Sequence, residues 1–82
     1  MSFNIIPTKL FLSRLEKLDN SITSGVEKKL DKLKENPVAS EHRMHHAHNF
    51  FRLYLRNYRI IYKVDGQNVI LFDLIKRSEG YE

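Results

Sequence analysis

Two kinds of apolar spacing divide the chain, a helical one before residue 36 and an alternating one after residue 50. Thr8, which follows Pro7, is a suitable N-cap for a first helix. The apolar stripe of this helix recurs at spacings of three and four residues and comprises Leu10, Phe11, Leu15 and Leu18. The pattern predicts a short amphipathic helix.

A second amphipathic helix is predicted between a break at residues 19–21 and the pair Asn36-Pro37. Its apolar stripe comprises Ile22, Val26, Leu30 and Leu33. Proline cannot continue a helix, and it biases the residue before it away from helical conformation. We therefore expect the helix to end before Pro37.

Strict alternation begins at Phe50 and predicts a strand with two unlike faces. The apolar face carries Phe51, Leu53 and Leu55. The opposite face is basic and carries Arg52, Tyr54 and Arg56.

The rest of the chain predicts a β-hairpin. Residues 58–64 are rich in β-branched and aromatic side chains, and Asp65-Gly66 marks a tight turn. Residues 69–76 return as the partner strand and are apolar on both alternating faces apart from Asp73, which we expect to be buried. A strand with two apolar faces is typical of the centre of a sheet, so we expect this one to be central and covered on both sides.

The predicted fold class is α+β. A fourth, short strand is expected at residues 3–6. The order is then an N-terminal strand, a two-helix hairpin and a three-stranded antiparallel meander. We expect the helices to cover one face of the sheet and to leave the other partly open for a ligand or partner.

Length and composition narrow the class of protein. The 82 residues allow one compact domain, spanning residues 1–82. The absence of cysteine excludes disulfides, thiolate zinc sites and cysteine nucleophiles. No apolar run approaches the roughly 18 residues of a membrane span, and the N-terminus lacks a signal-peptide pattern. We therefore expect a cytoplasmic protein without membrane contact, and its net charge of +4 favours an anionic partner.

Residues 42–63 form a basic, aromatic segment without any Asp or Glu. Its cations are Arg43, Arg52, Arg56, Arg59 and Lys63, and its aromatic residues are Phe50, Phe51, Tyr54, Tyr58 and Tyr62. Arginine binds phosphate through paired hydrogen bonds, and aromatic rings stack on unpaired bases, so the segment suits RNA. A solvated basic face is the alternative interpretation. Tyr54 is the better stacking candidate, because Tyr58 and Tyr62 share the predicted core face.

Four histidines, His42, His45, His46 and His48, precede this strand. Their spacing matches no zinc motif, so we expect no metal ion and no cofactor, and favour a loop whose charge varies with pH. The sequence also lacks a Ser-His-Asp arrangement, a Walker loop, a dinucleotide-binding turn and a marked pair of catalytic carboxylates. Any catalysis would therefore use arginine, lysine, tyrosine or these histidines.

Three motifs of the C-terminal half together resemble the RelE/ParE toxin superfamily. They are the basic strand at residues 51–57, the run Tyr58-Arg59-Ile60-Ile61-Tyr62 before the hairpin, and the closing run Lys76-Arg77-Ser78-Glu79-Gly80-Tyr81. The two preceding helices fit in order and length, so the resemblance covers nearly the whole chain. It implies a RelE-like fold and a toxin of a type II toxin–antitoxin pair.

The RelE branch of this superfamily implies a specific reaction. Such toxins enter the ribosomal A site and cleave mRNA without a metal ion, which inhibits translation. The 2′-hydroxyl of the RNA attacks the adjacent phosphodiester and leaves a 2′,3′-cyclic phosphate and a 5′-hydroxyl. By position, the resemblance implies catalytic roles for Arg52, Arg59, Arg77 and Tyr81. Lys76 is the alternative to Arg77, and we expect RNA contacts from Lys76 and, in the basic, aromatic segment, from Arg43, Tyr54 and Arg56.

The chain departs from the RelE pattern in two places. Tyr54 stands where the best-known RelE enzymes have a lysine proposed as the base, and a phenol is a poor base at neutral pH, so the base is unassigned. The chain also ends one residue after Tyr81, so we do not expect the additional C-terminal helix of some relatives.

Two other functions fit the same superfamily. One is a ParE-like inhibitor of DNA gyrase, and the other is a catalytically weak module that binds an antitoxin and regulates transcription. In each case we expect a RelB-like antitoxin as partner, in a toxin–antitoxin hetero-oligomer. An acidic or amphipathic segment of that antitoxin would neutralise the basic face. The ribosome and mRNA are further partners if the protein cleaves mRNA.

Overall fold

The computed structural model describes residues 2–37 and 50–76. Its elements follow the predicted order and confirm the α+β class. They are β1 (Asn4–Pro7), α1 (Lys9–Leu15), α2 (Asn20–Leu33), β2 (Phe50–Leu55), β3 (Tyr58–Asp65) and β4 (Asn68–Lys76). No helix within the described ranges has the length and apolar character needed to cross a membrane.

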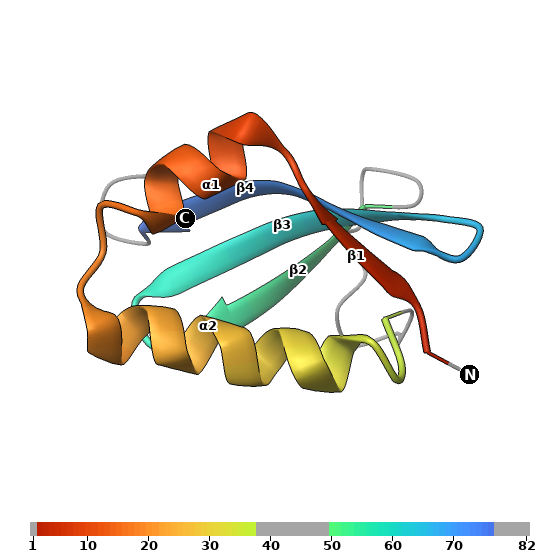
Figure 1. The fold of residues 1–82 in the computed structure, drawn as a ribbon, viewed down its shortest axis with the longest axis horizontal. Coiled ribbons are helices and arrows are strands. Elements are labelled where there is room, and N and C mark those ends of the chain that lie inside the picture. Colours follow the sequence, from red (N-terminus) through yellow and green to blue (C-terminus); the bar gives the residue numbers. More distant parts are fainter. Residues whose placement is uncertain (1, 38–49, 77–82) are drawn as a thin grey trace.

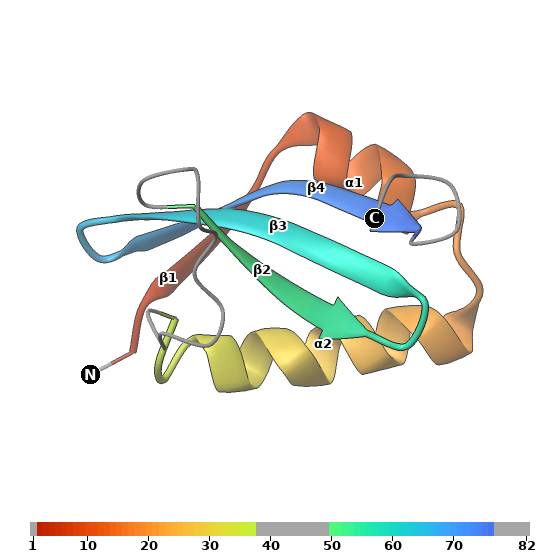
Figure 2. The ribbon, with the colours of Figure 1, turned by 180° about the vertical axis from the view of Figure 1, so that it is seen from behind.

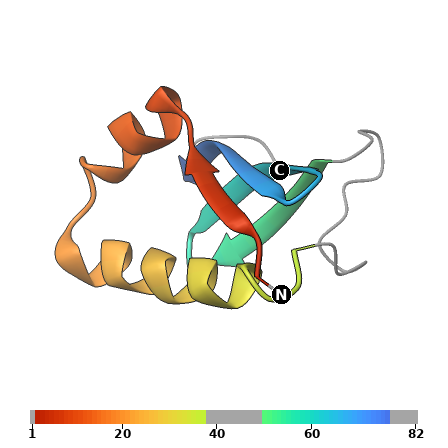
Figure 3. The same cartoon turned by 45° about the vertical axis from the view of Figure 1, so that its right-hand side comes forward.

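The four strands form one sheet in the order β1-β4-β3-β2. β1 is parallel to β4, and the other neighbours are antiparallel. Both helices lie on the same side of the sheet (Figure 1, Figure 3). Seen from behind, neither helix crosses in front of β2 or β3 (Figure 2). Within the part of the chain that the structure describes, the helices cover one face of the sheet and leave the other open, as expected.

Thr8 joins the first strand to the first helix. As the predicted N-cap, its hydroxyl accepts a hydrogen bond from the Phe11 N–H at 3.3 Å. The same hydroxyl lies 2.8 Å from the carbonyl oxygen of Leu71 in β4, and the Thr8 N–H donates to that carbonyl at 3.1 Å. One residue thus caps α1 and fixes its start to β4.

Asp19, which lies in the break predicted at residues 19–21, caps α2 in the same way. Its carboxylate accepts hydrogen bonds from the Ser21 hydroxyl at 2.9 Å and from the Ile22 N–H at 3.2 Å. These bonds favour the ionised form and lower the pKa of Asp19 below its ordinary value. The stabilisation is therefore present at neutral pH and is lost as the pH falls through the lowered pKa.

The core lies between α2 and the helix-facing side of the sheet. Both predicted stripes contribute to it, but α1 buries only Phe11 completely. Leu15 is the last residue of α1 and is partly buried, as is Leu18, which lies beyond the end of the helix rather than in it as predicted. Leu10, which the spacing places in the stripe, is 48% exposed. The prediction that Leu10 faces the core is wrong. α1 has only seven residues and packs beside β4, and Phe11 is its one buried residue.

β4 is central, as predicted, but it is not covered on both faces. The antiparallel register shifts between Ile61 and Tyr62, which pair with Asp73 and Leu71, so Phe72 has no opposite residue. This β-bulge changes the parity of the side chains, and Phe72 is left 39% exposed. Successive residues of β4 are apolar because the bulge changes which side chains face the core, and not because both faces of the strand are covered.

Asp73, which we expect to be buried, is only partly so. Its side chain is 22% exposed and forms a salt bridge with Arg14 of α1, at 2.5 Å from Nε to Oδ1. The same carboxylate accepts a hydrogen bond from the Leu74 N–H. The pairing explains how an acid is tolerated within this strand.

Tyr62 connects the sheet to the chain that follows α2. It is fully buried, stacks on Phe51 with ring centroids 5.3 Å apart, and donates a hydrogen bond to the carbonyl oxygen of Pro37 at 2.7 Å. Burial raises the pKa of Tyr62 above its ordinary value, so the phenol stays protonated and remains a donor.

Removing this hydroxyl should destabilise the fold. Tyr62→Phe leaves the buried Pro37 carbonyl without its donor, which costs about 1–2 kcal/mol. We expect a lower midpoint of urea unfolding at neutral pH. Tyr58→Phe is the matched control, because the described residues offer the Tyr58 hydroxyl no hydrogen bond, and its effect should stay within about 0.5 kcal/mol. Equal effects of the two changes would contradict this account.

Candidate functional site

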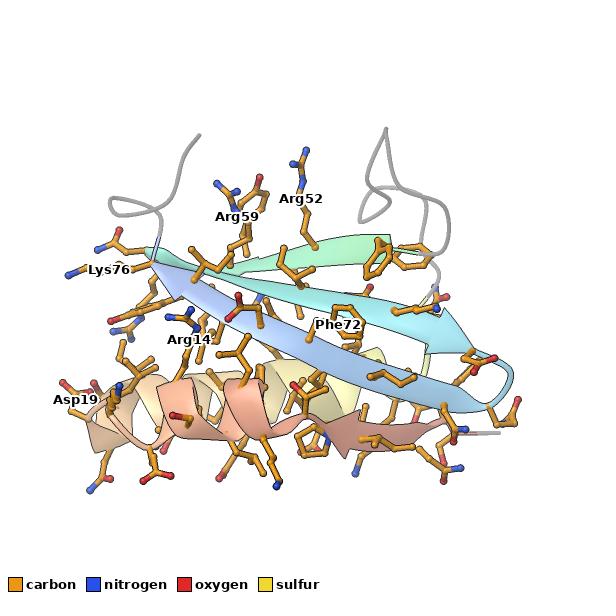
Figure 4. The ribbon with its side chains drawn as sticks, turned by 90° about the horizontal axis from the view of Figure 1, so that it is seen from above. Arg14, Asp19, Arg52, Arg59, Phe72 and Lys76 are labelled. Carbon is orange, nitrogen blue, oxygen red and sulfur yellow. The ribbon has the colours of Figure 1, made fainter. Side chains whose placement is uncertain are left out.

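The open face of the sheet carries a cluster of three polar side chains from two strands. Arg52 and Tyr54 alternate with the buried residues of β2, and Arg59 lies on β3. Tyr54 is directly opposite Arg59 in the antiparallel register. Arg52 and Arg59 project from the sheet on the side away from the helices (Figure 4). We call these residues the Arg52–Tyr54–Arg59 cluster.

Both arginines are close to the tyrosine ring. The guanidinium carbon lies 5.9 Å from the ring centroid for Arg52 and 5.6 Å for Arg59, within the range of cation–π attraction. Arg59 is only 8% exposed, whereas Tyr54 is 45% exposed. The cluster therefore combines a guanidinium held in place by its surroundings with an accessible ring.

A second group lies on the same face, where β2 begins. The rings of Phe50 and Phe72 meet edge to face at 5.1 Å between centroids, and the ammonium of Lys63 lies 5.9 Å from the Phe50 ring centroid. Phe72 was not singled out from the sequence, because its place on this face depends on the bulge in β4. The open face thus carries aromatic and cationic side chains at both ends.

This arrangement can bind a polyanion that carries planar groups. Guanidinium groups form paired hydrogen bonds with phosphate oxygens, and an exposed ring provides a stacking surface for a base. Residues 42–63 contain no Asp or Glu. Across the strands, Asp73 shares a row with Arg52 through Ile61, and its carboxylate is paired with Arg14. The cluster is therefore suited to single-stranded nucleic acid.

Arg56 does not belong to this face, contrary to the prediction. β2 ends at Leu55, and Arg56 lies in the turn before β3 with a left-handed φ of 54°. Its charge also contributes to the lowered pKa of Asp19, at the start of α2. The turn interrupts the alternation, so Arg56 lies near the helix layer.

Lys76 lies at the last position of β4, opposite Tyr58. With Tyr58 and Leu74 it borders a hollow on the helix side of the sheet, so it is not beside Arg59 on the open face. Arg43, Arg77, Tyr81 and the four histidines lie outside the described residues. Within the described ranges, no group of three or more His, Asp or Glu side chains could hold a metal ion.

Comparisons with known proteins agree with this fold. The family model described as the ParE toxin of type II toxin–antitoxin system, parDE, matches residues 5–81. Curated protein sequences give no match.

Solved structures of RelE toxins share the architecture. The isolated E. coli RelE toxin has a TM-score of 0.87 and 19% identity, with 96% of this chain and 88% of that chain covered. The toxin of the intact E. coli RelBE toxin–antitoxin complex has a TM-score of 0.84 and 20% identity, with 92% and 96% covered. The archaeal RelE–RelB complex from Pyrococcus horikoshii has a TM-score of 0.81 and 19% identity, with 98% and 100% covered.

The exposed ring of Tyr54 should contribute to RNA binding by stacking. Tyr54→Ala should weaken binding of poly(U) by about 1–3 kcal/mol, whereas Tyr54→Phe should retain it, because the ring and not the hydroxyl stacks. Fluorescence anisotropy at fixed salt measures both. Lys28→Ala, on the exposed side of α2, is the control for truncating a side chain away from the cluster. Equal losses for the Ala and Phe variants would count against stacking.

Proposed function

Because this chain belongs to the ParE toxin family of type II toxin–antitoxin systems, we propose that it is a ribosome-dependent endoribonuclease. In this proposal it cleaves mRNA in the ribosomal A site and thereby inhibits translation. The observation that carries the proposal is the Arg52–Tyr54–Arg59 cluster on the open face of a RelE-like sheet.

The proposed reaction is an intramolecular phosphoryl transfer within the RNA. The 2′-oxygen attacks the adjacent phosphorus and loses its proton to a base, while the 5′-oxygen of the next nucleotide leaves and gains a proton. The products are a 2′,3′-cyclic phosphate and a 5′-hydroxyl. No metal ion takes part.

Arg59 and Arg52 would stabilise the extra negative charge of the phosphorane. A donor that is already positioned is worth more than a mobile one, because it needs no reorganisation during the reaction. Arg59 fits this requirement, since it is 8% exposed and lies opposite Tyr54 in the register. We assign it the central contact with the scissile phosphate.

The proton transfers need groups beyond this cluster. Tyr81 and Arg77 are our candidates for proton transfer and leaving-group stabilisation, on the resemblance of the closing run to RelE toxins. Tyr54 would hold a base by stacking rather than act as the general base.

We further propose that a RelB-like antitoxin covers the open face and blocks RNA. The RelE structures in complex with RelB support a partner of this kind. An acidic segment would neutralise the arginines, and an apolar side chain could contact Phe72, which is 39% exposed. Toxin and antitoxin would then form a hetero-oligomer in the cytoplasm.

Inhibition of DNA gyrase is the second candidate function. It is favoured by the ParE family model, which spans residues 5–81. A gyrase inhibitor needs no phosphorane-stabilising arginine, so the effect of Arg59 on RNA cleavage separates the two functions.

The test is to add antitoxin-free protein to programmed ribosomes and to naked mRNA, and then to map the RNA ends. We expect cuts only on ribosomes, with 2′,3′-cyclic phosphate ends. Arg59→Ala should lower the cleavage rate at saturating ribosomes roughly 10²- to 10³-fold. Arg59→Lys, which keeps the charge but loses the paired donors, should fall between this variant and wild type.

Two controls make the result interpretable. Circular dichroism checks that the Arg59 variants fold, because Arg59 is buried. Lys28→Ala, which removes a charge from α2, should cleave at the wild-type rate. Folded wild-type protein that leaves ribosomal mRNA intact but inhibits supercoiling by gyrase would refute the nuclease and support the second candidate.

A further inference from the structure

A basic hollow lies on the helix side of the sheet, at the end where β3 begins and β4 ends. Its volume is about 280 Å³. It is lined by Arg14, Lys17, Leu18, Tyr58, Leu74 and Lys76. Three cations thus converge from α1, the turn after it and β4, although the sequence separates the first from the last by most of the chain.

Arg14 is held in place at this hollow. Its Nε is paired with the carboxylate of Asp73, which the Leu74 N–H also orients. The pairing uses one edge of the guanidinium and fixes its position next to β4. Arg14, Lys17 and Lys76 together carry three positive charges against the one negative charge of Asp73, so the hollow keeps an excess of positive charge.

The hollow and the proposed reaction site lie on opposite faces of the same end of the sheet. Tyr58 and Arg59 are consecutive on β3 and point to opposite faces, and they pair with Lys76 and Ile75 of β4. A chain that leaves Arg59 around this end of the sheet therefore meets Lys76 first (Figure 4). Arg14 lies further along the same path, between β4 and α1.

We propose that this hollow binds a backbone phosphate of the RNA strand that occupies the open face. This inference rests on the proposed function and extends its RNA-binding surface past the end of the sheet. Arg14, Lys17 and Lys76 would contact the phosphate. The side chains of Tyr58 and Leu74 would contact the sugar or base beside it.

RNA fits the lining better than an acidic peptide does. A nucleotide presents an anion and a planar apolar surface within a few ångströms, and the hollow presents cations beside an aromatic ring and two leucines. A carboxylate of the antitoxin would pair with the cations but would make no contact with the aromatic ring and the two leucines. Binding of an antitoxin peptide is therefore the competing outcome of the test.

The probe is a short fluorescein-labelled RNA with 2′-O-methyl groups, which cannot be cleaved. We expect Lys17→Gln and Lys76→Gln each to weaken its binding roughly threefold to fivefold. The slope of log affinity against log salt should decrease by about 0.7 for each lost phosphate contact. Arg14→Gln should weaken binding at least as much, and Arg14→Lys should restore part of the loss.

Lys28→Gln is the matched control, because it removes the same charge from α2 away from the hollow. Effects of Lys17→Gln and Lys76→Gln no larger than that of Lys28→Gln would overturn the proposal. The proposal would also be overturned if these two variants bound the RNA with wild-type affinity but lost binding to the antitoxin. That result would assign the hollow to the antitoxin. Urea unfolding of each variant shows whether the fold is retained.

The two proposals fail in different ways. If wild-type protein leaves ribosomal mRNA intact while the hollow variants still weaken RNA binding, only the nuclease proposal fails. If cleavage depends on Arg59 while the hollow variants bind the RNA normally, only the hollow proposal fails.

Discussion

The register between β2 and β3 is the constraint on which both the core and the site depend. Side chains alternate along a strand, so a shift of one residue would exchange the buried Phe51, Leu53 and Leu55 with the polar side chains between them. Burial of the apolar set therefore fixes the position of Tyr54 opposite Arg59. The energy that stabilises the fold therefore also positions the cluster on the open face.

The bulge in β4 gives the two faces of the sheet their different uses. By changing the side-chain parity after Leu71, it lets Leu71 and Leu74 both face the core while Phe72 remains on the surface. It also places Asp73 where Arg14 can pair with it. β4 is thereby linked to α1, and the guanidinium of Arg14 is ordered through that link.

The sequence was informative wherever the signal is local. The cap at Thr8, the break at residues 19–21 and the alternation of β2 depend on neighbouring residues, and the structure confirms each of them. The bulge depends on pairing between distant strands, so Phe72 and the Arg14–Asp73 pair could not be predicted. Arg56 was misplaced because a left-handed residue in a turn carries no signal when it is not glycine.

We propose that RNA occupies the open face of β2 and β3. The most direct measurement is an NMR titration of ¹⁵N-labelled protein with an uncleavable 2′-O-methyl RNA, followed through the backbone amides. We expect the amides of Arg52, Tyr54 and Arg59 to shift most, and those around Lys28 on the exposed side of α2 to stay in place. Shifts concentrated on α2, with β2 and β3 unchanged, would contradict it.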